Sequence, residues 1–292
     1  MKFLLCFVLI FFSYQNSYGA EIVKYSDYLK EVYPCENIYN NPCGDVIDRL
    51  VLIKDIEYYG LDGKLRNNGR IVVMDVVAES IIKILDDLKK IKFPFYKIGS
   101  NSGYKTVNYW FFFKKKIPIT DYNYTAAYSC RAMASGGNKS IHSYGLAIDV
   151  NPLFNPYLHI NHKDKKVSFI IPKDGIYYLN MIKERLDKPT IAGKIDQKVV
   201  DIFKYHGWSV WGGYWDFPID SMHFQIPNQM AKLLAKMDYE DSKKLYDIHV
   251  KYVRNFGNNI NFKANDLFLS ELYKTDRTEF WKFIKDEISN IK

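Results

Sequence analysis

The chain has 292 residues, of which 48% are hydrophobic and 16% aromatic, and its formal net charge at pH 7 is +8. This composition excludes a disordered or low-complexity chain and predicts a globular protein with a sizeable core. The positive charge favours anionic polymers as partners. The lysines are spread along the chain, and the sequence has no nucleic-acid-binding motif or internal repeat, so we expect no nucleic-acid partner.

The N-terminus has the pattern of a signal peptide. Lys2 precedes an apolar run at residues 3–12, and the small residues Ser17, Gly19 and Ala20 follow. We therefore expect residues 1–20 to be removed after Gly19 or Ala20, giving a periplasmic or extracellular protein. The alternative is a buried N-terminal strand or helix. Beyond this segment every apolar run is shorter than the 18 residues of a membrane-spanning helix, so none is expected after cleavage.

Three cysteines remain once Cys6 leaves with the signal peptide. Cys35 and Cys43 flank a segment rich in Pro and Asn, and Cys130 lies far away in the sequence. Loop character and an oxidising compartment favour a disulfide between Cys35 and Cys43. The alternative is that all three are small buried hydrophobic side chains.

The expected elements follow in chain order. Residues 21–70 predict an irregular, turn-rich lead-in with a helical pattern at 45–56. In residues 73–91 apolar side chains recur every three or four positions, which predicts a helix with one apolar face. The positions of that face are Val77, Ile81, Ile84, Leu85, Leu88 and Ile91. Further patterns predict strands at 95–98, 107–113, 147–150, 167–171 and 209–211, and a helix at 196–205.

This uneven order of strands and helices predicts an α+β fold with a mainly antiparallel sheet. After Pro227 the patterns at 228–253 and 266–291 predict a C-terminal helical extension. The chain thus divides into a signal peptide (1–20), a lead-in (21–70), a central domain (71–227) and the extension (228–292).

The segment from Ser140 to Asp149 carries two candidate metal ligands. Neutral imidazole and carboxylate both bind zinc, and a catalytic zinc site takes three protein ligands and leaves a fourth position for water. His142 and Asp149 supply two of the three if the chain turns back at Gly145, next to which the small Ala147 allows close backbone approach. Taken alone, both residues could be ordinary hydrogen-bonding groups.

A second segment, residues 211–225, offers the third ligand, His223. Asp220 lies three residues earlier and therefore within about 10 Å of whatever His223 binds. A carboxylate beside a metal-activated water suits general-base hydrolysis. Alternatively, this segment is an aromatic-rich core strand entered through a loop.

Together the two segments resemble the zinc peptidase family that includes VanY-type D-alanyl-D-alanine carboxypeptidases, D-Ala-D-Ala dipeptidases and phage L-alanyl-D-glutamate endolysins. The first signature of the family is Ser-x-His-x-x-Gly-x-Ala-x-Asp, and the second has an acidic residue three positions before a histidine. Both signatures are matched throughout, at Ser140, His142, Gly145, Ala147, Asp149, Asp220 and His223. The resemblance covers residues 71–226.

The resemblance implies one zinc ion per chain, held by His142, Asp149 and His223, with Asp220 as the general base. It also implies the α+β fold of the DD-peptidases, shared with the hedgehog signalling domain. Residues 125–131 and the Asn-Pro turns after Asp149 are similar to one branch of the family. By that likeness Arg131 binds the substrate carboxylate or polarises the scissile carbonyl, whereas a surface ion pair is the alternative.

The implied function is hydrolysis of the peptide stems of peptidoglycan, in which Asp220 passes a proton from the attacking water to the leaving amine. Carboxypeptidases of this family usually have Glu at the position of Asp220, whereas the endolysins have Asp, so D,D-carboxypeptidase and L,D-endopeptidase activity both remain open. A non-catalytic, zinc-bearing module that binds wall fragments or a partner protein is the other alternative. We expect His159, His162, His206 and His249 to be structural or exposed, and Trp211 and Trp215 to line the cleft or pack in the core.

Overall fold

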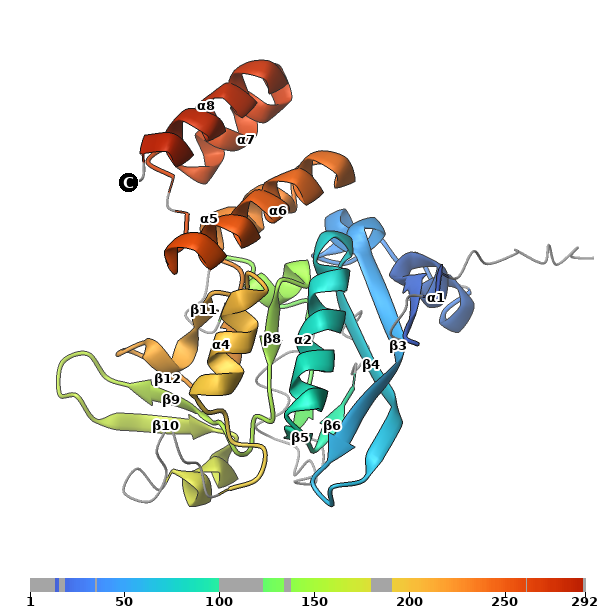
Figure 1. Cartoon of the computed structure of the whole chain (residues 1–292), viewed down its shortest axis with the longest axis vertical. Helices are drawn as coiled ribbons and strands as arrows, with labels where there is room; N and C mark the ends of the chain where they lie inside the picture. Colours follow the sequence, from blue (N-terminus) through green and yellow to red (C-terminus); the bar gives the residue numbers. More distant parts are fainter. Residues whose placement is uncertain are drawn as a thin grey trace, which may run out of the picture.

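The computed structural model describes residues 14–15, 19–34, 36–99, 123–133, 138–179, 191–260 and 262–290. The strand expected at 107–113, Cys35 and most of the expected signal peptide lie outside these residues. The described chain combines helices with mainly antiparallel strands, so the expected α+β class is confirmed (Figure 1).

An N-terminal sheet forms one side of the molecule. Its strands β2 (Glu21–Lys24), β3 (Leu50–Gly60) and β4 (Leu65–Met74) are antiparallel. At the edges, β1 (Tyr14–Gln15) pairs with β2, and β5 (Pro94–Phe95) pairs in parallel with β3. Helix α1 (Tyr25–Val32) and the short 3-10 helix η1 (Gly44–Arg49) connect β2 to β3.

The prediction of a helix at 45–56 is wrong beyond its first turn, because β3 begins at Leu50. The prediction of an irregular lead-in is also wrong, because β3 and β4 occupy much of it. Strand β3 is covered on both faces: Leu50 and Leu52 pack in one hydrophobic cluster, and Ile53 and Ile56 pack in another. A strand buried on two faces loses the alternating pattern, which explains the misleading helical spacing. The boundary expected between residues 70 and 71 falls within β4, and the division of the chain into four parts stays a prediction.

Helix α2 (Ala78–Lys90) packs on β3 and lies beside α4 (Gln197–Tyr205) (Figure 1). It begins later than expected, because the chain up to Met74 continues β4 and residues 75–77 form the 3-10 turn η2 (Asp75–Val77). The expected apolar face is buried apart from Ile91, which is exposed beyond the end of the helix. The expected helix at 196–205 is confirmed, with Asp196 as its N-cap accepting a hydrogen bond from the Val199 amide.

Two small sheets lie next to these helices. In the first, β13 (His223–Gln225) lies between β11 (Val210–Trp211) and β8 (Ala147–Asp149). In the second, β9 (Tyr157–Ile160) lies between β10 (Val167–Ile171) and β12 (Ile219–Asp220). A parallel pair, β6 (Lys97–Ile98) and β7 (Tyr124–Thr125), completes the described strands. These pairings confirm the strands expected at 147–150, 167–171 and 209–211. The strand expected at 95–98 is divided between β5 and β6, which pair with different partners.

The C-terminal region is helical, as expected, but each long pattern is divided in two. The helices are α5 (Asn228–Leu234), α6 (Tyr239–Phe256), α7 (Asp266–Thr275) and α8 (Arg277–Asn290). Asp238 divides the first pattern because its side chain caps α6, accepting a hydrogen bond from the Asp241 amide. Leu233 and Leu245 belong to the same hydrophobic core as α2 and α4. None of the helices in the described part of the chain has the length and apolar character needed to cross a bilayer.

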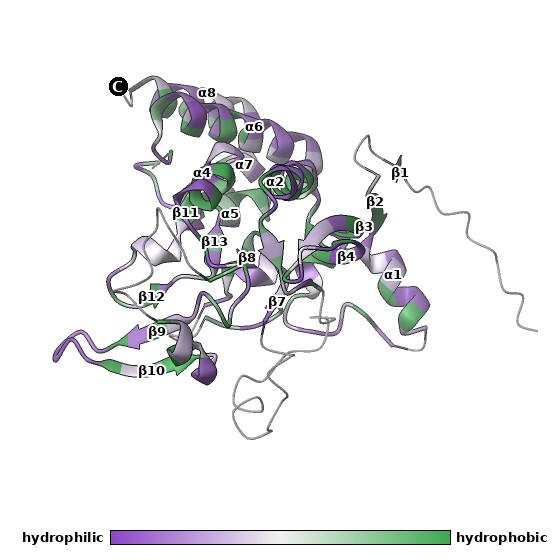
Figure 2. Cartoon of the chain, turned by 60° about the horizontal axis from the view of Figure 1, so that its bottom comes forward, coloured by the Kyte–Doolittle hydropathy of each residue, from purple (hydrophilic) through white to green (hydrophobic). Residues whose placement is uncertain are grey.

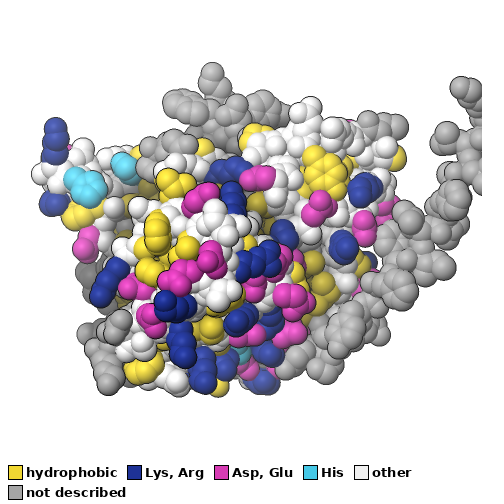
Figure 3. All heavy atoms as spheres, turned by 90° about the horizontal axis from the view of Figure 1, so that it is seen from above, with side chains coloured by type: hydrophobic (Ala, Val, Ile, Leu, Met, Phe, Trp, Pro, Cys, Tyr) yellow, Lys and Arg dark blue, Asp and Glu magenta, His cyan; other side chains and the backbone are white. Residues whose placement is uncertain are grey.

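The surface seen from above carries acidic and basic side chains mixed together (Figure 3). The net positive charge is therefore not gathered on this face. A separate feature of the fold is the hairpin of β9 and β10, which extends outward from the rest of the described chain (Figures 1 and 2).

Candidate metal centre

The first motif forms a short 3-10 helix, η4 (Ile141–Tyr144), that carries His142. Ser140 precedes it, and the Ser140 hydroxyl accepts a hydrogen bond from the His142 amide. Gly145 ends the helix in the left-handed conformation, with φ of 66°. A Cβ atom at Gly145 would lie 2.7 Å from the Met74 amide nitrogen, so the site needs glycine for both conformation and space. The Met74 amide donates to the Gly145 carbonyl and holds this turn against β4.

Strand pairing brings the other two candidate ligands together. Asp149 ends β8 and lies directly opposite His223 of β13. The Asp149 Oδ1 atom is 3.0 Å from His223 Nδ1 and 3.2 Å from His142 Nε2, and the two ring nitrogens are 3.2 Å apart. Three ligand atoms from two motifs therefore form a compact triangle, as the sequence predicts.

This triangle fits a zinc ion. Donors at about 2.0–2.1 Å from a tetrahedral zinc lie about 3.3 Å from one another. The remaining ring nitrogens are also partnered: His142 Nδ1 lies 2.6 Å from the Ala127 carbonyl oxygen, and His223 Nε2 lies 2.7 Å from Gln225 Oε1. Because both partners are acceptors, each histidine donates through that nitrogen and keeps the lone pair of the other nitrogen for a metal.

The charge states also suit metal binding. Burial alone raises the pKa of the Asp149 carboxyl, but His142 and His223 outweigh burial and lower that pKa below its usual value. Burial lowers the pKa of His142. Burial also acts to lower the pKa of His223, yet the hydrogen bond that the Asp149 carboxylate accepts and the charge of Asp220 raise it overall. An ionised Asp149 and a neutral His142 are the forms that bind metals.

Asp220 lies beside the triangle on β12. Its Oδ1 atom is buried and has no hydrogen-bond partner among the described residues. Burial raises the pKa of Asp220 to about 7, and the charge of Asp149 adds to this rise against the opposing charge of His223. Gly212 packs closely against it, since a Cβ there would lie 2.5 Å from the Asp220 carbonyl oxygen. A buried carboxylate that titrates near neutral pH is suited to accept and return a proton.

Arg131 approaches the same centre from a neighbouring segment. It is half-buried. Its charge adds to the lowering of the His142 pKa and opposes the rise of the Asp220 pKa. Ser143 fixes its backbone: the Arg131 amide donates to Ser143 Oγ, and that hydroxyl donates to the Arg131 carbonyl. The charge of Arg131 thus acts on groups of the candidate site, and its role toward substrate stays a prediction.

A disulfide supports the segment that carries Arg131. Cys130 is bonded to Cys43, which overturns the expected pairing of Cys35 with Cys43. The segment runs between β4 and η4: the Tyr128 amide donates to the Val72 carbonyl, and the Ser129 amide donates to the His142 carbonyl. Position in the fold, rather than nearness in sequence, selects the disulfide partner of Cys43.

Two buried asparagines direct the chain from Asp149 to β9. Asn151 has a positive φ of 43°, and its side-chain amide donates to the carbonyls of Pro94 and Gly193. Asn155 donates to the Gly193 carbonyl as well and accepts from the Ile195 amide. The two Asn-Pro turns noted in the sequence therefore place β9, and with it Tyr157, next to Asp220.

The remaining histidines lie away from the ligand triangle. His206 bonds to Asp87, and His249 is buried and bonds to the Gly207 carbonyl. His159 stacks on Phe169, and His162 contacts Phe217.

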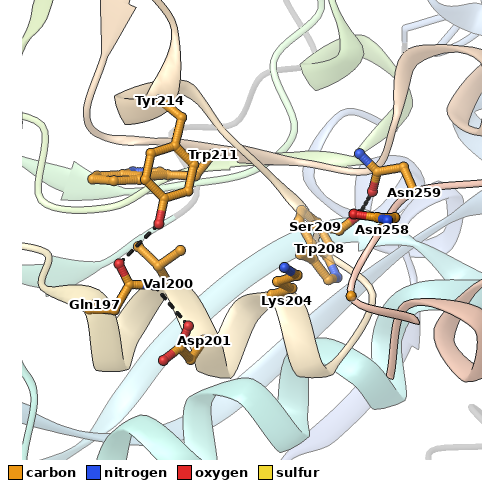
Figure 4. A pocket seen from close by; sticks show the side chains of 11 residues that line it. Gln197, Val200, Asp201, Lys204, Trp208, Ser209, Trp211, Tyr214, Asn258 and Asn259 are labelled. Atoms are coloured by element: carbon orange, nitrogen blue, oxygen red, sulfur yellow. Dashed lines mark hydrogen bonds between the residues drawn. The ribbon is translucent and has the colours of Figure 1, made fainter. Parts of the chain in front are cut away.

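The two tryptophans have different places. Trp215 is half-buried with its ring 5.5 Å from that of His223, so it borders the candidate site. Trp211 is buried and packs on Phe224. It also lines a separate cavity of about 190 Å³, where the Tyr214 hydroxyl donates to Gln197 (Figure 4).

Sequence reasoning missed two groups that orient the ligands. Gln225 was detectable in principle, because it lies two residues after His223 and therefore on the same face of a strand. Ala127 acts through its backbone carbonyl, which every residue type has, so the sequence could not indicate this role.

An α+β fold in which two histidines and a carboxylate converge beside an acidic side chain with one buried oxygen defines a candidate metal-dependent hydrolase. Residues 134–226 match the model of a protein family described as D-alanyl-D-alanine carboxypeptidase. The match contains the three candidate ligands and Asp220, confirms the family resemblance, and supports a peptidase. Arg131 precedes the matched segment. Comparison with curated proteins and with solved structures gives no significant match.

Proposed function

We propose that this protein is an exported zinc peptidase that hydrolyses the peptide stems of peptidoglycan. One observation carries the proposal: the ligand atoms of His142, Asp149 and His223 meet within 3.2 Å of one another beside Asp220, whose Oδ1 atom is buried. This arrangement lies in the segment that matches a peptidase family.

His142, Asp149 and His223 would hold the zinc ion. When bound, zinc would lower the pKa of a water molecule and polarise the scissile carbonyl. The three side chains are already oriented for this task by hydrogen bonds to Ala127 and Gln225 and by strand pairing. Little rearrangement would then be needed on metal binding.

Asp220 would move the proton. Its carboxylate would accept a proton from the attacking water and then donate it to the leaving amine, which breaks the peptide bond. Without metal, burial raises the pKa of Asp220 to about 7, so this carboxyl holds a proton more readily than an ordinary aspartate and can return it to the leaving amine. The permanently charged Arg131 would bind a substrate carboxylate or stabilise negative charge on the carbonyl oxygen.

Substrate and compartment rest on the family and on the cysteines. The description of the matched family supports a stem peptide ending in D-alanine, whereas Asp at position 220 favours the L,D-endopeptidase branch. The Cys43–Cys130 disulfide supports an oxidising compartment, as does the N-terminal signal pattern.

Digestion of purified muropeptides by the zinc-loaded mature chain tests the proposal. Free D-alanine among the products would establish a D,D-carboxypeptidase, and a freed stem peptide would establish an L,D-endopeptidase. His142→Ala is the matched negative control. Binding of muropeptides without any cleavage would reject the enzyme and favour a wall-binding module.

A further inference from the structure

The hairpin of β9 and β10 begins at the candidate general base. Asp220 of β12 pairs directly with Tyr157 of β9. Directly opposed residues lie on the same face of a sheet, and so do residues two apart along a strand. His159 follows Tyr157 by two positions and pairs with Phe169 of β10. Tyr157, His159 and Phe169 therefore share the sheet face that carries Asp220, and we call these three residues the hairpin surface.

The rings of the hairpin surface are ordered against one another but leave much of their area open. His159 and Phe169 stack with centroids 4.6 Å apart and planes 7° apart, and Tyr157 continues the stack at 6.4 Å from His159. The Tyr157 hydroxyl lies 3.3 Å from His159 Nδ1. Nevertheless Phe169 is 45% exposed, and Tyr157 and His159 are only half-buried. Exposed apolar rings that are held in order next to a candidate active site are typical of a binding surface.

The tip of the hairpin adds positive charge. Lys163 and Lys166 are exposed there, and their ammonium groups have no ion-pair partner among the described residues. Lys165 lies over the ring of Phe217, 3.9 Å from its centroid. The surface that leads away from Asp220 is therefore aromatic first and basic at its end.

The length of this surface requires an extended ligand. A strand rises about 3.3 Å per residue, so His159 lies about 7 Å and the tip about 13 Å beyond Tyr157. A substrate cut beside Asp220 must continue well past the scissile bond to reach these groups. Sugar rings present apolar faces that pack on aromatic side chains, and the carboxylates of neighbouring stems complement the basic tip.

We propose that the hairpin surface binds the glycan strand from which the cleaved stem peptide extends, with Lys163 and Lys166 meeting anionic groups along it. This inference rests on the proposed function, since it identifies the outer part of the same substrate. It assigns the aromatic side chains of β9 and β10 to holding carbohydrate, and it leaves the chemistry to the residues around Asp220.

Binding of carbohydrate tests this assignment without any hydrolysis. The full mature chain is titrated with a tetramer of β-1,4-linked N-acetylglucosamine and cosedimented with purified peptidoglycan. We expect Phe169→Ala to weaken both interactions about tenfold, and Phe169→Tyr to retain them because the ring remains. Phe268→Ala is the matched control, since Phe268 is similarly exposed, at 50%, on α7. Lys163→Glu and Lys166→Glu should weaken only the interaction with the anionic polymer, and should do so most at low salt.

Hydrolysis provides a second, separate measurement. With a glycan-linked stem as substrate, Phe169→Ala should raise KM several-fold more than with the free stem peptide. Equal effects on the two substrates would overturn the assignment and indicate a peptide-binding surface. The assignment would also be overturned if the wild-type chain did not bind the tetramer. The same holds if Phe169→Ala left the binding of tetramer and polymer unchanged. If no substrate is hydrolysed but the tetramer binds through Phe169, the proposed function fails while the carbohydrate site stands.

Discussion

His142 and His223 direct different ring nitrogens at one point, with Nε2 of the first 3.2 Å from Nδ1 of the second. Opposite tautomers are needed for this arrangement. The Ala127 backbone carbonyl fixes the tautomer of His142, whereas the Gln225 side chain fixes that of His223. Only the second partner can be removed by substitution, which makes the orientation of the ligands testable.

Gln225→Met should weaken zinc binding about 10- to 100-fold without removing a ligand. Methionine has a similar volume but offers His223 Nε2 no comparable acceptor, so the ring loses its fixed tautomer. Competition with a chelator of known affinity measures the change. Gln197→Met, on α4, serves as the control, and equal zinc affinity in the Gln225 variant and the wild type would reject the orienting role.

The candidate ligands should each be indispensable. His142→Ala, Asp149→Ala and His223→Ala should abolish tight binding of the single zinc ion, because two remaining protein ligands make a poor tetrahedral site. Metal analysis of the purified variants measures this directly. Full zinc content in any one of them would remove that residue from the ligand set.

Asp220→Asn should separate chemistry from metal binding. Asn has nearly the same shape but cannot accept a proton, so we expect turnover to fall about 100- to 10,000-fold while zinc content stays near one per chain. Thermal stability should not fall, since the substitution removes an ionisable group whose charged form is disfavoured by burial. Loss of zinc would make Asp220 a ligand instead, and full activity would assign the base to another residue.

The disulfide should stabilise the segment that carries Arg131. Cys43→Ser or Cys130→Ser should each lower the free energy of unfolding by about 2–5 kcal/mol, because the bond closes a long loop. Chemical unfolding measures this loss. Peptide mapping without reduction should link Cys43 to Cys130, whereas a linkage of Cys43 to Cys35 would contradict the structure.

His249 should make the fold sensitive to acid. Burial lowers the pKa of His249 to about 4, against an ordinary value of 6.5. Between these two values the unfolded chain binds more protons than the folded chain, so stability falls as the pH drops from 6.5 towards 4. The largest loss from this residue is about 3 kcal/mol. Denaturant unfolding at several pH values should show a smaller decrease for His249→Gln, and parallel profiles of wild type and variant would contradict this role.

The candidate site was more predictable from sequence than the sheet that supports it. The spacing in the first motif requires a tight turn, and the structure places a left-handed Gly145 at that turn. By contrast, the apolar residues of β3 face two different clusters, and one-dimensional periodicity cannot distinguish such a strand from a helix.

Disulfide pairing shows the same limit. Cys35 and Cys43 are close along the chain, but the partner of Cys43 is 87 residues away. Cys130 is brought near Cys43 because the Tyr128 amide donates a hydrogen bond to the carbonyl of Val72 in β4, a contact that depends on the tertiary fold. Contacts that arise from the packing of distant segments leave no pattern that a single sequence reveals.

Arg49 sets a practical limit on how far the protein can be trimmed. Its guanidinium donates two hydrogen bonds to the carboxylate of Asp75, the first residue of η2, and also donates to the carbonyls of Leu234 and Met237. Arg49 and all three of these partners lie outside residues 134–226, the segment that matches the peptidase family. A recombinant fragment cut to those residues would lose the strand that supports Gly145 and would expose apolar surface on β8 and α4 to aggregation. Transplanting the metal site into another scaffold would accordingly require replacements for β4 and α5, not the motif-bearing segment alone.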